Sequence, residues 1–199
     1  IISPNDSSYS GQWGLAKIGA GSAWEIINSA PAVPIAVVDS GVDVNHPDLK
    51  DNIWQNKKEV AGNGLDDDKN GFIDDFNGWD FVNNLPDPSP KFQAGFNEDG
   101  INHGTIVAGI IAAAGNNAAG VAGVSWKAQL MPLKILDDQG EGGTAKVIKA
   151  IDYAIANGAN IINLSFVGFG YSKSLDDAVK RAFDSGVLVV AAGGNEQAQ

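Results

Sequence analysis

The hydrophobic positions along the chain predict strands and helices in alternation. Short, continuous apolar runs indicate buried strands at 35–38, 130–136, 160–165 and 187–192. The segments between them carry apolar residues at spacings of three and four, which indicates helices. Such an alternation favours a parallel sheet that is covered on both faces. We therefore expect an α/β fold, a three-layer sandwich with a mostly parallel, doubly wound sheet.

Local signals predict where these elements begin and end. Helices that run to about residues 114, 157 and 183 are expected to start at small polar residues, namely Asn102, Thr144 and Ser172. Residues 1–19 are expected to form an extended arm, followed by a short helix over 20–28. Pro132 lacks a backbone donor, so its strand is not expected at an interior, hydrogen-bonded position.

A histidine stands at the start of the helix expected after Asn102. As the N-cap, Asn102 would place His103 in the first turn, where the positive end of the helix dipole disfavours imidazolium. A neutral imidazole is what a general base requires. A lone histidine at a helix start is more often a packing residue, so its interpretation depends on the neighbouring groups.

Two further polar residues follow predicted strands. Asp39 ends the run at 35–38, and Asn195 follows the run at 187–192. The carboxyl ends of parallel strands are where open α/β sheets bind ligands. An aspartate, a histidine and an amide donor are the groups that serine acyl transfer uses beside its nucleophile.

Three ordered motifs resemble those of the subtilisin-like serine proteases, or subtilases. The segment 39–42 resembles the aspartate motif of the family, 103–109 its histidine motif and 192–195 its oxyanion-hole motif. The resemblance extends over nearly the whole chain, from Trp13 onward. It implies a serine endopeptidase in which Asp39 orients His103, His103 is the general base and then the general acid, and Asn195 is the oxyanion donor.

The resemblance also implies a polypeptide substrate, bound in extended conformation as an added strand. One substrate edge would contain Gly140 and Gly142. The opposite edge and the wall of the first specificity pocket would be formed by Ser165, Phe166, Val167, Gly168, Ala192 and Gly193. Subtilases often carry a second histidine where Ile106 stands, and a glycine pair is usual in place of Val167 and Gly168. Because valine is larger than glycine, Val167 predicts a narrower rim of the first specificity pocket.

The nucleophilic serine of the family has no counterpart in these 199 residues, because no Gly-Thr-Ser-x-Ala stretch occurs. We therefore expect residues 1–199 to be the amino-terminal two thirds of one subtilase catalytic domain, truncated on its C-terminal side. This segment alone is expected to be inactive, and unstable without the remaining part of the domain. A non-catalytic, calcium-stabilised pseudoprotease module that binds peptides is the alternative.

Composition narrows the possible partners. The 13 basic and 24 acidic side chains give a net charge of -11, which argues against nucleic-acid binding. The chain has no cysteine, and no apolar run approaches the roughly 18 residues of a membrane span. Secretion to the extracellular space is implied by the family resemblance alone.

An acidic stretch between the first two motifs predicts calcium as a cofactor. Residues 66–75 contain five aspartates, with oxygen side chains at positions 1, 3 and 5 followed by a glycine, as at the start of a calcium loop. The insertion spans about 57–80. Its expected ligands are the side chains of Asp66, Asp68, Asn70 and Asp75 and the carbonyl of Phe72. Asp48, with Asn117 in a nearby loop, matches a position that often binds a second calcium in the family.

Overall fold

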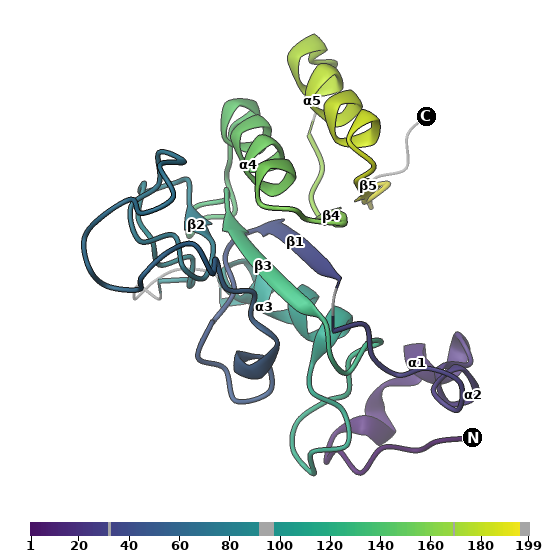
Figure 1. Cartoon of the computed structure of the whole chain (residues 1–199). Helices are drawn as coiled ribbons and strands as arrows, with labels where there is room; N and C mark the ends of the chain where they lie inside the picture. The colour runs from purple at the N-terminus through teal and green to yellow at the C-terminus, as the bar shows by residue number, and fades with distance from the viewer. Residues whose placement is uncertain (32, 92–97, 169, 196–199) are drawn as a thin grey trace.

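Five parallel strands form the central sheet of the described chain (Figure 1). This computed structural model describes residues 1–31, 33–91, 98–168 and 170–195, and only the backbone of 98–101. The strands are β1 (Pro34–Asp39), β2 (Trp79–Asp80), β3 (Gln129–Lys134), β4 (Ile161–Leu164) and β5 (Leu188–Ala191). They lie in the order β2-β3-β1-β4-β5, and every neighbouring pair is parallel. The carboxyl ends of all five strands therefore lie along the same edge of the sheet, which we call its carboxyl edge. β1 is the middle strand.

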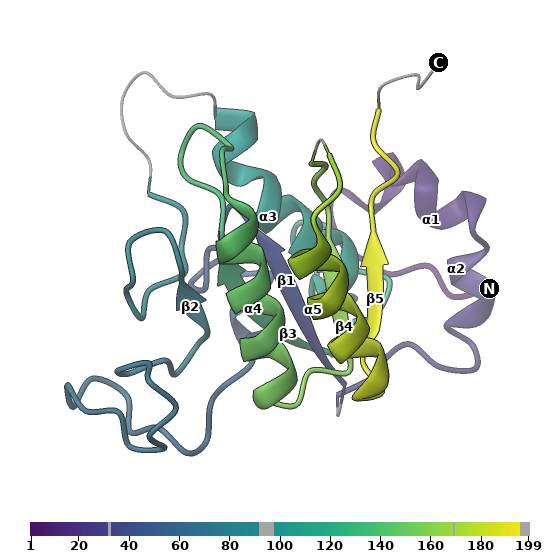
Figure 2. The same cartoon turned by 90° about the horizontal axis from the view of Figure 1, so that it is seen from above.

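Helices cover both faces of this sheet, as Figure 2 shows. α3 (Glu98–Ala112) lies on one face, and α4 (Thr144–Ala156) and α5 (Lys173–Asp184) lie on the other. The shorter helical elements are η1 (Tyr9–Gly11), α1 (Trp13–Lys17), α2 (Ala20–Ala23) and η2 (Lys50–Asn52). No helix in the described ranges is long and apolar enough to cross a bilayer. The three-layer α/β fold expected from the sequence is confirmed.

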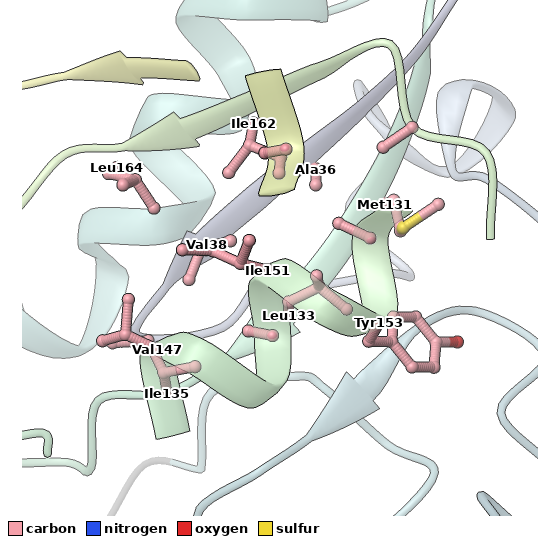
Figure 3. Packing of buried hydrophobic residues seen from close by; sticks show 14 of the residues in the cluster. Ala36, Val38, Met131, Leu133, Ile135, Val147, Ile151, Tyr153, Ile162 and Leu164 are labelled. Carbon is pink, nitrogen blue, oxygen red and sulfur yellow. The ribbon is translucent and has the colours of Figure 1, made fainter. Parts of the chain in front are cut away.

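Alternate residues of β1 face the two layers of helices. Ile35 and Val37 belong to the cluster that contains α3 residues, and Ala36 and Val38 belong to the cluster with α4 and α5. Figure 3 shows the second cluster, in which side chains of β1, β3 and β4 pack against α4. A strand between two layers is apolar on both sides. The same alternation directs Asp39, the last residue of β1, toward the layer of α3.

The amino-terminal segment is folded, which corrects the extended arm expected over 1–19. Leu15 of α1 is buried in a cluster with Trp24, against which Trp126 packs. The rings of the two tryptophans have centroids 5.1 Å apart. This contact joins residues about a hundred positions apart, so local sequence could not predict it. The helix expected over 20–28 is also shorter, because α2 ends at Ala23.

The helix that carries His103 begins earlier than expected. α3 starts at Glu98, so His103 is its sixth residue and Asn102 is not its N-cap. The helix dipole acts mainly within the first turn, so the effect of the dipole on His103 that was expected from the sequence does not apply.

Pro132 lies in an interior strand, contrary to expectation. Ile135 donates its N–H to the Asp39 carbonyl on β1, so alternation along β3 turns the backbone of Pro132 toward β2. β2 pairs with β3 only at Leu133 and Lys134. The proline therefore lies outside that short ladder, and its missing donor is tolerated.

The two later helix starts were predicted to within one residue. α4 begins at Thr144 with Gly143 as its N-cap, so Thr144 is the first helical residue and not the cap. Ser172 is the N-cap of α5, as expected, and its hydroxyl accepts a hydrogen bond from the N–H of Leu175. Gly158 follows α4 with a φ of 75°, in agreement with its expected role of ending the helix.

The approach of α3 to β1 requires a residue without a side chain. A Cβ atom built on Gly104 would lie 2.3 Å from the carbonyl oxygen of Gly41 and 3.0 Å from the Cβ of Asp39. On the same helix, a Cβ atom on Gly109 would meet nothing within 4 Å. Gly104 therefore sets the distance between the helix and the end of β1.

We predict that Gly104→Ala destabilises the full-length gene product by about 1–3 kcal/mol, because the added methyl group forces α3 away from the turn at Gly41. Gly14→Ala is the matched control, because Gly14 is also helical, lies in α1 away from the surface of α3, and a Cβ atom there would meet nothing within 4 Å. It adds the same methyl group in open space and should be neutral or stabilising by up to about 1 kcal/mol. Denaturant unfolding of the two variants measures the difference, and equal free energies of unfolding would contradict it.

The edge strand β5 exposes apolar side chains. Leu188 and Val190 are 60% and 46% exposed, and Phe183 of the adjoining α5 is 76% exposed. An uncovered apolar edge strand is a template for further pairing. These residues form an apolar surface that no other described residue covers.

For this reason we predict that residues 1–199, produced alone, lack a cooperative unfolding transition. Urea titration followed by near- and far-ultraviolet circular dichroism tests this expectation. Coincident, sigmoidal transitions in both signals would show two-state unfolding and contradict it.

Candidate functional site

A buried aspartate and a half-exposed histidine form the centre of the site. Asp39 Oδ1 lies 2.8 Å from His103 Nδ1. The Asp39 side chain is fully buried, whereas that of His103 is 44% exposed. The N–H of Ser40 donates to the same carboxylate oxygen at 2.7 Å. The carboxylate is thus fixed from the protein side, while the ring remains accessible to a ligand.

The turn after Asp39 is attached to α3 by further hydrogen bonds. The N–H of Gly104 donates to Ser40 Oγ at 3.1 Å, and the N–H of Asp43 donates to Thr105 Oγ1 at 3.0 Å. Gly41 has a φ of 108°, and a Cβ atom there would lie 2.5 Å from the Pro88 carbonyl oxygen. A glycine is required at this position for both reasons.

The segments proposed as substrate edges flank Asp39 because β3 and β4 are the two neighbours of β1. Gly140 and Gly142 follow β3 and are exposed. Gly140 has a φ of 79°, and a Cβ atom on Gly142 would lie 2.8 Å from the Ile135 carbonyl oxygen. Both positions therefore favour glycine for reasons of backbone geometry.

The opposite segment follows β4. Ser165 and Phe166 are partly buried, and Val167 and Gly168 are exposed. Phe166 packs against the main core, and Ser165 Oγ accepts a hydrogen bond from the amide of Asn163. The Val167 side chain is therefore exposed beyond the end of β4.

Asn195 lies at the same sheet edge but is separated from β1 by β4. Ala192 donates its N–H to the Leu164 carbonyl, which extends the β4–β5 ladder by one residue. The three residues Ala192, Gly193 and Asn195 are exposed. The structure therefore joins Asp39 to His103 directly and leaves the Asn195 amide exposed at the end of the neighbouring strands.

The acidic loop gathers three carboxylates at a second place. Oxygen atoms of Glu59, Asp68 and Asp75 all lie within 4.8 Å of one another. Glu59 and Asp75 are buried, and Asn56 donates from its amide to both Asp68 and Asp75. Glu59 Oε2 is buried and has no hydrogen-bond partner within the described residues. Negative charges this close in a buried setting repel strongly unless a cation joins them.

Asp75 also joins the loop to α4. The hydroxyl of Tyr153 donates to Asp75 Oδ2 at 2.5 Å. Burial, then this hydrogen bond and the nearby negative charges, raise the pKa of Tyr153 above its ordinary value, so the hydroxyl remains a proton donor. Phe72 packs edge-on against Tyr153, with ring centroids 5.0 Å apart.

The expected calcium ligands separate into different roles. Asp68 and Asp75 belong to the carboxylate group, and Asn70 contacts it through a hydrogen bond from its amide to Asp75. Asp66 is not among the three grouped carboxylates, and its two oxygens accept the N–H groups of Asn70 and Gly71.

Asp48 lies in a separate place, beside the loop that contains Asn117. Its Oδ1 accepts a hydrogen bond from the Asn117 amide at 2.6 Å, and its Oδ2 accepts the N–H of Val121 at 3.0 Å. A Cβ atom on Gly120 would lie 2.1 Å from Asp48 Oδ2. The buried Asp48 therefore organises this loop through direct hydrogen bonds.

Sequence reasoning missed two residues of these sites. Glu59 precedes the aspartate run by several positions and belongs to no recognisable motif. Lys134, the last residue of β3, is buried and donates to the Ser40 carbonyl beside Asp39. A charged residue at the end of an otherwise apolar strand was the available signal.

Comparison with known proteins adds the family context. Residues 31–199 match the model of the Subtilase family. The chain is 42% identical over 194 residues to subtilisin-like protease 1 of Plasmodium berghei (strain Anka), which covers 96% of this chain and 31% of that protein. It is 39% identical over 193 residues to thermitase of Thermoactinomyces vulgaris, covering 96% of this chain and 58% of thermitase. It is 36% identical over 184 residues to subtilisin amylosacchariticus of Bacillus subtilis subsp. amylosacchariticus, covering 92% of this chain and 40% of that protein.

The chain thus spans less than two thirds of each of these relatives. The family match, in contrast, extends over most of the chain and includes Asp39, His103 and Asn195. The resemblance seen in the sequence is confirmed, and this chain belongs to the subtilase family.

Proposed function

We propose that this chain provides the aspartate and the histidine of a serine endopeptidase, whose nucleophilic serine lies outside the 199 residues. The observation that carries the proposal is the 2.8 Å contact between Asp39 Oδ1 and His103 Nδ1 at the carboxyl edge of the sheet. Membership of the subtilase family supports the same reaction class.

In the proposed mechanism, the Asp39 carboxylate accepts a hydrogen bond from the Nδ1–H of His103 and so fixes the imidazole tautomer with Nε2 free as the base. His103 takes the proton of the serine hydroxyl as the serine attacks the scissile carbonyl. The imidazolium, stabilised by the buried Asp39 carboxylate, then donates that proton to the leaving amine. The Asn195 side-chain amide donates a hydrogen bond to the oxyanion.

The proposed substrate is a polypeptide in extended conformation. It would lie between the segments after β3 and β4, because these flank Asp39 on both sides. Backbone hydrogen bonds to the segments around Gly142 and Ser165 would hold it as an added strand. The Val167 side chain would narrow the pocket for the residue that precedes the cleaved bond.

A test uses the full-length gene product with a serine-directed fluorophosphonate and a chromogenic peptide. We predict labelling and hydrolysis, and a fall in kcat of about ten-thousand-fold for Asp39→Asn, because the amide no longer favours the correct tautomer. Asp51→Asn is the matched control, since Asp51 is exposed and close to Ile53, which pairs with Leu130 at the end of β3 opposite to the catalytic pair; its kcat should be unchanged.

The absence of both labelling and hydrolysis in the full-length product would reject the peptidase. Peptide binding without hydrolysis would support the pseudoprotease alternative in its place.

We further propose that the carboxylates of Glu59, Asp68 and Asp75 bind Ca²⁺. The unpartnered, buried Glu59 Oε2 supports a cation here, and hard oxygen ligands are those that calcium prefers. The bound ion would supply positive charge that removes the repulsion among the three groups. Asp66, Asn70 and the carbonyl of Phe72 are the remaining candidates in this loop, and Asp48 is the candidate for a second site.

We predict that Ca²⁺ raises the Tm of the EDTA-treated full-length product, adding about 2.7 kcal/mol at a hundredfold excess over Kd. Glu59→Gln and Asp75→Asn should each weaken this response by about tenfold or more in Ca²⁺ concentration. Asp51→Asn should respond like the unmodified protein. A Tm that ignores Ca²⁺, or a full response in both loop variants, would contradict calcium binding at this site.

The uncovered surfaces suggest how the rest of the domain is bound. Ile106 and Ile110 of α3 are 56% and 60% exposed, and Leu188 and Val190 of β5 are exposed as well. We propose that the remaining part of the same catalytic domain packs on these residues. Secretion to the extracellular space is likewise proposed from the family relationship, and detection of the product in culture medium would test it.

A further inference from the structure

Lys134 is a buried cation at the floor of the proposed active site. It ends β3, and its side chain is 1% exposed. In the β1–β3 register Lys134 stands opposite Asp39, so the two side chains leave the sheet on the same face. Burying an ammonium group is costly unless hydrogen bonds satisfy it. The hydrogen-bond partners of the Lys134 ammonium group therefore indicate which segments of the protein it holds in place.

The Lys134 ammonium bridges two functional segments. Nζ donates to the Ser40 carbonyl at 2.7 Å and to the Leu136 carbonyl at 2.8 Å. Ser40 directly follows Asp39, and Leu136 begins the segment that leads to Gly140 and Gly142. A third contact, to Asp138 Oδ1, is longer at 3.5 Å.

The methylene stem of Lys134 supports the same turn from below. A Cβ atom on Gly41 would lie 3.3 Å from Lys134 Cδ, so the stem packs beneath the backbone at that residue. The N–H of Ser40 donates a hydrogen bond to Asp39 Oδ1. Both the N–H and the carbonyl of Ser40 are thus engaged, one by the carboxylate and the other by the lysine.

We propose that Lys134 is a positioning residue of the peptidase. By holding the Ser40 carbonyl, its ammonium keeps the Asp39 carboxylate aligned with His103 Nδ1. By holding the Leu136 carbonyl, it fixes the adjacent substrate edge relative to that pair. The inference rests on the proposed peptidase function, although Lys134 itself touches neither substrate nor reacting atoms.

Kinetics of Lys134→Met in the full-length gene product test the proposal. Active sites are first titrated with a fluorophosphonate, so that kcat is expressed per competent site. The expected result is a fall in kcat per titrated site on the order of 10- to 100-fold, because small errors in the alignment of catalytic groups are costly. Lys134→Gln keeps a neutral donor and should give an intermediate loss.

A control variant separates this role from general charge effects. Lys149→Met removes an exposed lysine of α4 and should leave kcat unchanged.

A purely structural lysine would lower the number of titratable sites and the Tm but leave kcat per site unchanged, and that outcome overturns the proposal. If both Lys134 variants lack titratable sites while the unmodified protein has them, the lysine serves folding and the positioning role is rejected. If the unmodified protein is neither labelled nor active, the peptidase proposal fails first.

Discussion

The hydrogen bond between Asp39 and His103 joins the middle strand of the sheet to α3, and the site depends on it. Two structural conditions make it possible. Asp39 must end β1 on the face that α3 covers, which the alternation of β1 ensures. The helix must also approach closely, which Gly104 permits because a side chain there would collide with Gly41. The contact therefore results from strand geometry and helix packing together, and neither element could form it alone.

Two of the groups of buried charged side chains are connected through α4 and the segment that precedes it. At the carboxyl edge of the sheet, Lys134 holds the turn after Asp39. At the acidic loop, Asp75 accepts a hydrogen bond from Tyr153 of α4. α4 begins immediately after the segment that contains Gly142, so the acidic loop supports the helix that follows a proposed substrate edge. A cation in that loop would thus stabilise more than the loop itself.

Much of the fold could be predicted from the sequence because β1, β4 and the later helices have strong local patterns. Ser172 capped α5 as expected, since N-capping is a local interaction. The errors arose where distant residues decide the outcome. Trp24 and Trp126 fold the amino-terminal arm, and the short β2 leaves room for Pro132 in an interior strand. For the same reason Glu59 could not be assigned to the acidic site, because only the folded loop brings it to Asp68.

The state of the His103 Nδ1 proton tests the central interaction most directly. In the full-length protein, proton–nitrogen NMR of labelled histidine should show a Nδ1–H resonance shifted far downfield, protected from exchange and absent in Asp39→Asn. Such a signal is expected of an imidazole N–H that donates to a buried carboxylate. A His103 ring whose Nδ1 proton exchanges freely and is insensitive to Asp39 would contradict the account.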